Sequence, residues 1–420
     1  MLGVWPRKYY SLERAVCQFR SRHTASMYPP DQQPAWRRPE VLLILMASAV
    51  PLSFATWSNL INNFAIERAA FTGAEIGILQ SLREIPGFLA FAVVLVLLLL
   101  REQSLALWSL LLLGIGTAAT GFFPSVIGLY LTTIVMSLGY HYYETVQSSL
   151  ALQWIDKRHA PETLGRIIAV GSFTAVLSYV FILLVFSKFG VDFKQTYVIG
   201  GGLTCLIALI GWLAFPNFPQ AVVQHKKVIL RSRYWLYYAL TFISGARRQI
   251  FMVFAGFLLV EKFHYTVPEI SLLFFINGGL NMLLAPKIGR MIAKWGERRA
   301  LILEYIGLII IFVAYAVVDD ALVAAGLYVV DHLFFALAIA IKTYFQKIAD
   351  PADIAATAAV GFTINHIAAV VIPAVFGIIW LTSPSIVFLA GAAMAAVSLA
   401  LSLLVPRNPL PNYETVWSAR

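Results

Sequence analysis

The sequence predicts an all-α integral membrane protein with twelve transmembrane helices. Of its 420 residues, 60% are hydrophobic and only 12% are charged, and its mean hydropathy is +0.78. A soluble chain of this length needs more polar surface. Apolar stretches of about 18 or more residues, which span a hydrocarbon core roughly 30 Å thick, recur along nearly the whole chain. Lipid offers backbone groups no hydrogen-bond partners, so these stretches must be helices.

Short connections separate the expected spans, and several contain a proline that ends a helix, such as Pro124, Pro216 and Pro384. The spans are expected at 41–62, 74–99, 104–123, 126–154, 164–187, 195–215, 234–260, 267–292, 300–318, 321–347, 355–380 and 384–405. A basic linker at 217–233 divides them into an N-terminal bundle at 41–216 and a C-terminal bundle at 234–405. Tails at 1–40 and 406–420 complete the chain.

Basic residues gather on one side of the expected membrane. They occupy the N-terminal tail, the linker and the loops after even-numbered spans, whereas the other side holds only Arg68, Lys188, Lys194 and Lys262. The positive-inside rule therefore places both termini in the cytoplasm and the chain, as a multi-pass protein, in a cell (inner) membrane. Contact with the lipid bilayer explains the net charge of +10 without nucleic acid. Residues 1–26 are either a targeting segment or sequence that lies upstream of the true start at Met27. We favour the second interpretation.

The two halves repeat each other faintly. A shift of about 190 to 200 positions places Ile76–Leu107 on Ile270–Leu301, and Gly128–Tyr130 on Gly326–Tyr328. Duplicated six-helix halves are a recurrent construction of alternating-access carriers. The repeat thus predicts two pseudo-symmetric six-helix bundles around a central cavity.

The loop between the eighth and ninth spans contains Gly289, Arg290, Gly296 and Arg298. With twelve spans, cytoplasmic termini, a basic linker and similar halves, the chain resembles the major facilitator superfamily (MFS) of secondary transporters. This loop is similar to the family's glycine-anchored basic loop. The resemblance implies that these four residues form a cytoplasmic gating loop.

The loop departs from the family pattern in its acidic residue. The family's usual acid is replaced by Ala293, and Glu304 is the expected substitute in the gating loop. The matching loop of the first half, at 99–103, lacks the motif. The resemblance also implies that spans one, four, seven and ten line the central path.

Polar side chains inside the spans are the candidates for a functional site, because each charge near a helix centre costs roughly 2.5–3.5 kcal/mol. They are Arg83, Glu84, Glu144, Arg247, Arg248, Asp331, Lys342, His141, His332, His366, Asn59, Asn62 and Asn63. Most of them lie on spans one, four, seven and ten.

The fourth span carries His141 and Glu144 on one helical face, with Tyr140 and Tyr143 on the neighbouring face. We expect Glu144 to exchange protons beside His141, in a site walled by aromatic rings. A buried Glu144 that is paired with an arginine for packing alone is the alternative.

Arg247 and Arg248 are adjacent in the seventh span, and successive helical residues diverge by about 100°. We expect one guanidinium to reach the cavity and favour an anionic group. The other is expected to reach a helix interface or an acid such as Glu144 or Asp331. A structural ion pair is the alternative for either arginine.

Asp331 and His332 form a second acid–base pair, in the tenth span. Asn59 and Arg83 complete the residues that we assign to substrate binding or coupling. His366 is expected to be a hydrogen-bonded packing histidine. Arg83 and Glu84 either neutralise each other or fix a kink.

Signatures of soluble enzymes are missing from the sequence. No Walker loop and no recognisable nucleophile motif occurs, and Cys17 and Cys205 are the only cysteines. We therefore expect no enzymatic activity, no cofactor, no bound metal and no disulfide framework.

The leading hypothesis is alternating-access transport of a small organic solute, with an anionic group as one option. A proton is the expected coupling ion, and uptake and efflux both stay open. Glu144 or Asp331 would be the coupling acid and Arg247 or Arg248 the counter-charge. Oligomerisation is not required.

Two alternatives remain. The first is a divalent-metal transporter with ligands among His141, Glu144, Asp331, His332 and His366. The second is a non-transporting assembly factor or sensor that keeps the scaffold.

Overall fold

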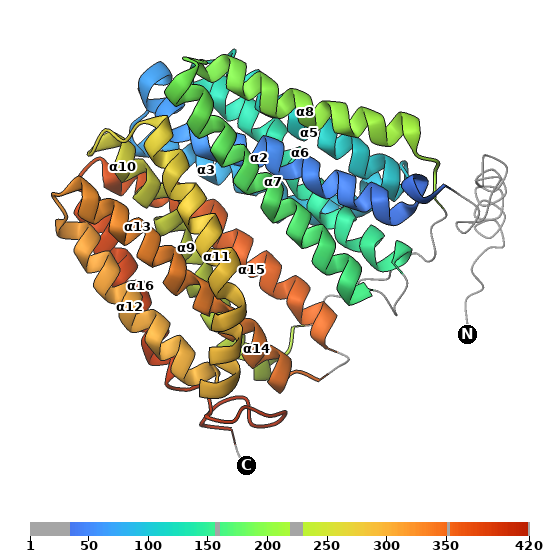
Figure 1. Ribbon diagram of the computed structural model, residues 1–420. Coiled ribbons are helices and arrows are strands. Elements are labelled where there is room, and N and C mark those ends of the chain that lie inside the picture. The colour runs from blue at the N-terminus through green and yellow to red at the C-terminus, as the bar shows by residue number, and fades with distance from the viewer. Residues whose placement is uncertain (1–33, 156–159, 219–229, 351–352, 419–420) are drawn as a thin grey trace, which may run out of the picture.

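The computed structural model describes residues 34–155, 160–218, 230–350 and 353–418, which are helical apart from short connections and the tail after Ser402 (Figure 1). The N-terminal half contains η2 (Ala35–Arg37), α2 (Pro39–Ala69), α3 (Gly73–Phe88), η3 (Leu89–Ala92), α4 (Val93–Val96), α5 (Glu102–Thr120), α6 (Val126–Trp154), α7 (Ala160–Lys188) and α8 (Phe193–Ala214). The C-terminal half contains η4 (Ser232–Tyr234), α9 (Trp235–Gln249), η5 (Ile250–Ala255), α10 (Gly256–Glu261), α11 (Val267–Trp295), α12 (Glu297–Val317), α13 (Ala321–Phe335), η6 (Ala336–Ala338), α14 (Ile339–Ile348), α15 (Ile354–Trp380) and α16 (Pro384–Ser402).

These helices form the twelve spans that the sequence predicts. Ten helical stretches among the described residues are long and apolar enough to cross a membrane. The other two spans are the interrupted run α3–η3–α4 and α6, whose middle carries His141 and Glu144. The predicted N-terminal tail and linker fall mostly on residues 1–33 and 219–229, which lie outside the described residues.

Capping boxes begin α3 and α11 in the same way. The carboxylate of Glu75 accepts the backbone N–H of Thr72 at 2.9 Å, and that of Glu269 accepts the backbone N–H of Thr266 at 2.8 Å. Thr266 and Glu269 follow Thr72 and Glu75 by the same 194 positions. The repeat in the sequence is therefore also a repeat of local structure.

Each half packs into a bundle of its own, and two helix pairs make most of the contacts between them (Figure 1). In the N-terminal bundle α5 lies against α6 and α8, and α2 lies against α7 and α8. In the C-terminal bundle α12 lies against α16, and α9 lies against α15 and α16. The joining pairs are α3 with α15 and α7 with α11.

The tightest contact between the bundles is the crossing of α3 and α15, at the end of the molecule opposite η2 and the end of α16 (Figure 1). A Cβ atom on Gly77 would overlap the carbonyl oxygen of Pro373 and the Cα atom of Gly377. A Cβ atom on Gly73 would overlap the indole of Trp380. Glycine is therefore needed here because the two backbones approach so closely.

The end of the C-terminal bundle at which α16 ends has its own buried cluster, which includes Tyr234, Tyr344 and Phe345. The C-terminal tail packs onto it, since the hydroxyl of Tyr344 donates to the carbonyl oxygen of Glu414 at 2.5 Å. Arg231 donates two hydrogen bonds to Asp353, each 3.1 Å long, and they hold the pKa of the Asp353 carboxyl below its usual range. This ion pair anchors the start of the C-terminal bundle to the start of α15.

Candidate functional site: a cavity between the two bundles

A cavity of about 320 Å³ lies between the two bundles. Its polar lining residues include Ser58, Asn62, Gln80, Arg83, Asn277, Asn281 and His332. Both halves contribute, from spans one, two, five, seven, eight and ten, and α6 adds no described residue to this lining. Of the four spans expected to line the central path, spans one, seven and ten line this cavity, and no described residue of span four does.

Three buried polar atoms in the cavity wall have no hydrogen-bond partner among the described residues. They are the indole N–H of Trp57 and the side-chain oxygens of Gln80 and Asn277. An unpaired buried polar group costs about 1–3 kcal/mol, which a bound polar molecule or water recovers. Arg83 and Asn277 are 194 positions apart, so the repeat places a polar side chain on each side of the cavity.

Arg83 is the charged side chain of this lining, and Glu84 pairs with it. Arg83 Nη2 lies 2.5 Å from Glu84 Oε1, and both side chains are 11% exposed. The guanidinium carbon of Arg83 lies 5.8 Å from the ring centroid of Trp57. The hydroxyl of Ser137 donates to the carbonyl oxygen of Arg83, which ties α3 to α6. The two residues neutralise each other, which was one of the two expectations for them.

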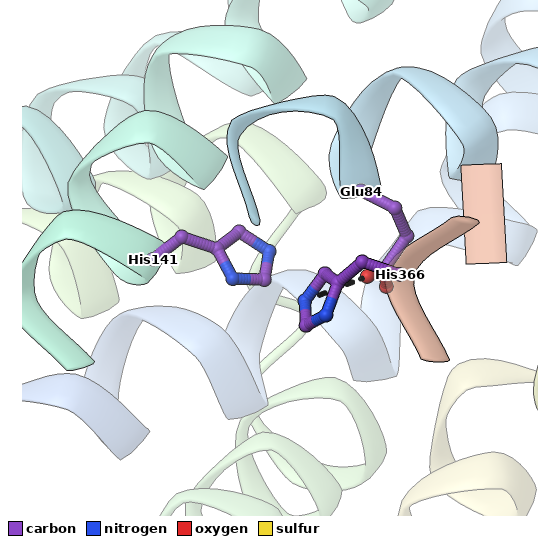
Figure 2. A group of neighbouring side chains, drawn as sticks. All are labelled: Glu84, His141 and His366. Carbon is purple, nitrogen blue, oxygen red and sulfur yellow. Dashed lines mark ion pairs between the residues drawn. The ribbon is translucent and has the colours of Figure 1, made fainter. Parts of the chain in front are cut away.

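The second oxygen of Glu84 faces a pair of histidines (Figure 2). Glu84 Oε2 lies 3.7 Å from Nε2 of His366, and the rings of His366 and His141 meet edge to face with centroids 5.4 Å apart. Glu84 is 9% exposed, His141 6% and His366 5%. The three residues come from α3, α6 and α15, so the cluster joins the N-terminal bundle to the C-terminal one.

Glu144 and Arg248 lie near this cluster on opposite bundles. Glu144 is exposed, and its carboxylate interacts electrostatically with His366, Glu84 and Arg248. Arg248 is half-buried and lies 5.4 Å over the ring of Phe335, which lines the cavity. These two predicted site residues therefore border the same region between the bundles.

Arg247 points away from that region, into the C-terminal bundle. Its Nη2 lies 2.8 Å from Oε1 of Glu304, and its Nη1 donates to the hydroxyl of Ser398 at 3.4 Å. Arg247 is 1% exposed and Glu304 is fully buried. The structure thus places Glu304 in an ion pair inside the bundle and not in the cytoplasmic loop, where the sequence had it as a substitute acid. For Arg247, this ion pair with Glu304 matches the alternative given above, in which the arginine forms a structural ion pair and does not reach the cavity.

Asp331 and His332 are adjacent but face different surroundings. Asp331 is buried, interacts electrostatically with Arg247 and Glu304, and has one carboxylate oxygen without a partner among the described residues. His332 lines the cavity, and its Nδ1 lies 2.9 Å from the amide nitrogen of Asn277. They do not form a joint acid–base pair.

Asn59 joins the two bundles beside the cavity. It is 1% exposed, and its side-chain oxygen accepts a hydrogen bond from the hydroxyl of Ser271 at 3.1 Å. It belongs to a contact between α2 and α11, whereas its neighbour Asn62 lines the cavity.

The predicted gating loop joins α11 to α12. Gly296 has φ +83, a conformation that favours glycine, and it ends α11. Gly289 and Arg290 lie in the last turns of α11, and Arg298 lies in the first turn of α12. The acid that forms an ion pair at this junction is Glu297, which lies 2.7 Å from Nζ of Lys347.

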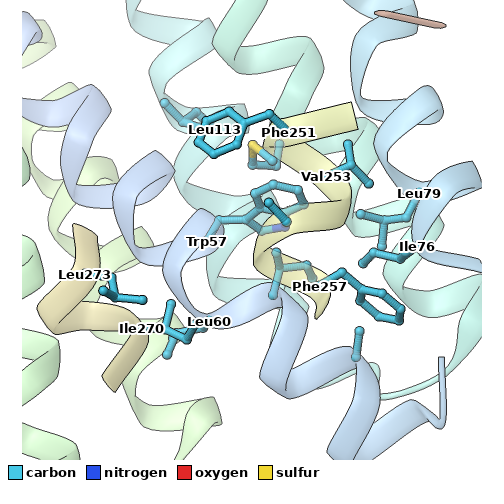
Figure 3. Close-up of a cluster of buried hydrophobic side chains, with 14 of the residues drawn as sticks. Trp57, Leu60, Ile76, Leu79, Leu113, Phe251, Val253, Phe257, Ile270 and Leu273 are labelled. Atoms are coloured by element: carbon cyan, nitrogen blue, oxygen red, sulfur yellow. The ribbon is translucent and has the colours of Figure 1, made fainter. Parts of the chain in front are cut away.

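Apolar side chains from both halves form one shared buried cluster, which reaches the cavity at Trp57 and Ile270 (Figure 3). Trp57, Leu60, Ile76 and Leu79 contribute from α2 and α3. Phe251, Phe257, Ile270 and Leu273 contribute from η5, α10 and α11. The bundles therefore share a core beside the cavity, whereas the cluster around Tyr344 belongs to the C-terminal half alone.

Sequence reasoning listed Glu84 and His366 among the polar candidates but assigned neither to substrate binding or coupling. Glu84 was read as a partner of Arg83, and His366 as a packing residue or, in the metal-transport alternative, as a ligand. Gly87 was not considered, although a Cβ atom there would overlap the imidazoles of both His141 and His366. The sequence did offer one signal for Glu84 and His366. Acids and histidines are rare inside membrane spans, so those that occur there are candidates for a functional site.

Comparisons with known proteins agree on the architecture. The family model described as the Major Facilitator Superfamily matches residues 41–373. The structure resembles the nucleoside transporter NupG (TM-score 0.68, 16% identity, covering 87% of this chain and 98% of that one). It also resembles a bacterial homolog to the human lysosomal transporter Spinster (TM-score 0.67, 14% identity, covering 88% of this chain and 96% of that one). A third similar structure is a POT family transporter in complex with 5-aminolevulinic acid (TM-score 0.66, 12% identity, covering 87% of this chain and 95% of that one). At these identities the likeness concerns the fold alone. No curated protein sequence matches the chain.

Proposed function

Because the chain belongs to the Major Facilitator Superfamily, we propose that it carries a small polar organic solute across a membrane by alternating access, driven by protons. The observation that supports this proposal best is the cavity of about 320 Å³ between the bundles, with unpaired polar atoms in its wall. Cavities of about 300–1,000 Å³ are typical of small-molecule sites. We place both termini in the cytoplasm, from the distribution of basic residues.

The cavity wall defines the chemistry of the solute. Trp57 offers a hydrogen-bond donor, and the side-chain oxygens of Gln80 and Asn277 offer acceptors. Tyr179 and Phe274, whose stacked rings lie 5.3 Å apart between centroids, supply a flat aromatic surface. A planar solute with both donors and acceptors fits this wall, and an anionic group on it would bind Arg83.

Coupling to protons follows from the pairing of Arg83 with Glu84. A solute carboxylate that takes the guanidinium of Arg83 leaves Glu84 without its counter-charge in a nearly dry site. Burial then disfavours the charged carboxylate, so Glu84 takes up a proton. Solute and proton are thereby bound together, and the gradients set the direction of net movement. Glu144, which borders the same region beside Arg248, is the carboxylate through which protons reach Glu84.

Reconstitution into vesicles with an imposed pH gradient tests the proposal. The solute mixture should include a nucleoside and 5-aminolevulinic acid, because structural neighbours are described with them. The wild type is expected to accumulate at least one solute. Arg83→Gln should lower the rate about 10- to 150-fold, the equivalent of about 1.5–3 kcal/mol for a hydrogen bond to a charged group. Arg68→Gln, an exposed arginine at the end of α2, is the matched control and should keep the wild-type rate.

A second variant separates binding from coupling. Glu84→Gln should still exchange the solute between equal concentrations but should no longer accumulate it against a gradient. Accumulation that is unchanged in Glu84→Gln would rule out this residue as the coupling acid. Silence of an intact, correctly inserted wild type towards the whole mixture would instead favour a protein that keeps the scaffold without transporting.

A further inference from the structure

We infer that Glu84, His141 and His366 bind one divalent transition-metal ion of the zinc class, which holds the two bundles together. The ligands come from α3 and α6 of the N-terminal bundle and from α15 of the C-terminal bundle (Figure 2). The inference concerns a bound ion that arrests movement and not a transported one, because none of the three residues lines the 320 Å³ cavity. Metal binding itself does not depend on the proposed solute.

The three ligand atoms are already close to the spacing that such an ion requires. One nitrogen or oxygen from each residue lies within 4.8 Å of the other two. Bonds of about 2.0–2.1 Å at tetrahedral angles place ligand atoms roughly 3.4 Å apart. The 3.7 Å between Glu84 Oε2 and His366 Nε2 nearly meets that value. Small side-chain rotations would close the remaining gap.

The hydrogen bonds of His366 leave its second nitrogen facing an anion. Its Nδ1 lies 2.9 Å from the carbonyl oxygen of Phe362, which can only accept, so Nδ1 carries the hydrogen. In the neutral ring, Nε2 then directs a lone pair at the carboxylate oxygen of Glu84. Two lone pairs that face each other in a buried site require a cation between them. A metal-binding histidine is commonly oriented in this way, by a backbone carbonyl on its other nitrogen.

His141 provides an independent observation. It is 6% exposed, and its Nδ1 has no hydrogen-bond partner among the described residues. A buried ring nitrogen without a partner is costly unless something coordinates it. One ring nitrogen of His141 lies within 4.8 Å of a ligand atom of His366 and of Glu84, so one metal ion at that point would coordinate all three residues.

The surroundings of the cluster suit a metal site in two further respects. Arg83 is bonded to the other oxygen of Glu84, Oε1, so it fixes the carboxylate and leaves Oε2 for the ion. Gly87 gives the two imidazoles room to meet, because any Cβ atom there would overlap both. Two imidazole nitrogens and one carboxylate oxygen favour zinc, nickel or cobalt over calcium or magnesium.

The ion would act on movement between the bundles. It would tie α15 to α3 and α6, and it would occupy the carboxylate that we propose as the proton acceptor. Alternating access requires the two bundles to move relative to each other. We therefore expect the ion to inhibit transport by holding the arrangement seen here.

Zinc titration of the chelator-stripped, full-length protein in detergent tests the inference, with no solute present. We expect saturation at one zinc ion per chain, and X-ray absorption showing two imidazole nitrogens and an oxygen at about 2.0–2.1 Å. His366→Gln should weaken binding at least tenfold. His264→Gln removes an exposed histidine outside the cluster and should bind zinc like the wild type.

Thermal unfolding provides a second, independent measure of zinc binding. Zinc should raise the melting temperature of the wild type and of His264→Gln but not that of His366→Gln, because a ligand stabilises only the state that binds it. His141→Gln serves as the second variant if His366→Gln does not fold. Equal zinc binding in the wild type and a cluster variant, or no saturable site at all, would overturn the inference and leave a proton as the cation between His366 and Glu84. Either result leaves the transport proposal untouched, since that proposal is tested by the movement of solute into vesicles and not by zinc binding.

Discussion

Arg247 and Arg248 are neighbours on α9, but they have different surroundings. Arg247 is buried inside the C-terminal bundle against Glu304, whereas Arg248 is half-buried and faces the region between the bundles. A helix turns by about 100° per residue, which is enough to separate a packing role from a site role. The consequence is a pair of substitutions in which each residue serves as the control for the other.

Arg247→Gln is expected to lower the free energy of unfolding by about 3–5 kcal/mol, because it leaves buried Glu304 without its partner. Arg248→Gln should change that free energy by no more than about 1 kcal/mol, the scale of its contact with the ring of Phe335. It should instead lower proton-driven transport. Denaturant unfolding in detergent and vesicle transport measure the two effects. Equal losses of stability in both variants would contradict the assignment.

The candidate site was only partly predictable from single residues. Arg83 and His332 line the cavity, and Glu144 and Arg248 border the region beside it. Helical spacing says which residues share a face, as it did for His141 and Glu144. It does not say which helix lies opposite that face. Glu84 and His366 meet across 282 positions of sequence, a contact that only the packing of α3 on α15 creates.

At the scale of elements, the crossing of α3 and α15 depends on residues that have no side chain. Gly77 lies against the backbone of Pro373 and Gly377, so the bundles meet backbone to backbone at this end. Small residues allow helices to approach closely in lipid, where dispersion contacts replace the hydrophobic effect. Closure of this end is therefore sensitive to a single methyl group.

Gly77→Ala should shift the equilibrium away from the state in which this end is closed, by about 1–3 kcal/mol, the usual cost of overpacking. Spin labels at Glu67 and Thr382, exposed residues of opposite bundles at this end, would report longer distances. Gly202→Ala is the control, because a Cβ atom on Gly202 meets nothing within 4 Å. A distance distribution that is the same in Gly77→Ala and the wild type would show that the crossing does not control closure.

Three spans are interrupted, and the sequence pattern did not predict the interruptions. The second span breaks at η3, the seventh passes through the π-helix η5 and the tenth through the 3₁₀-helix η6. Met252 of η5 and Ala336 of η6 both line the cavity. Irregular turns are frequent at functional sites in helices, and hydropathy cannot detect them because the residues stay apolar.

At the scale of the whole molecule, the fold was predictable because lipid removes most alternatives. Apolar length and turn residues gave the twelve spans, and the 194-position repeat gave the two halves. The repeat also placed Arg83 and Asn277, one from each half, in the lining of one cavity. The shape of that cavity was not predictable, since it depends on how far one bundle is rotated against the other.

Impermeant thiol reagents test the orientation that the basic residues predict. After Cys17 and Cys205 are replaced by serine, a cysteine at exposed Lys262 should react from outside intact cells. A cysteine at exposed Arg299 should react only after permeabilisation. The reverse pattern would place the termini outside and refute the predicted topology.

The packing of Gly73 on Trp380 has an optical consequence. Trp380 is 3% exposed, stacks on Phe254 with ring centroids 5.2 Å apart, and donates its indole N–H to Glu261 at 2.8 Å. Phe254 and Glu261 belong to the same bundle as Trp380, but Gly73 belongs to the other. Separation of the bundles at this end would therefore wet one face of the indole and leave its hydrogen bond in place. Indole fluorescence shifts to longer wavelength in water, so the close contact that shuts this end also supplies the protein with a native spectroscopic probe of its opening.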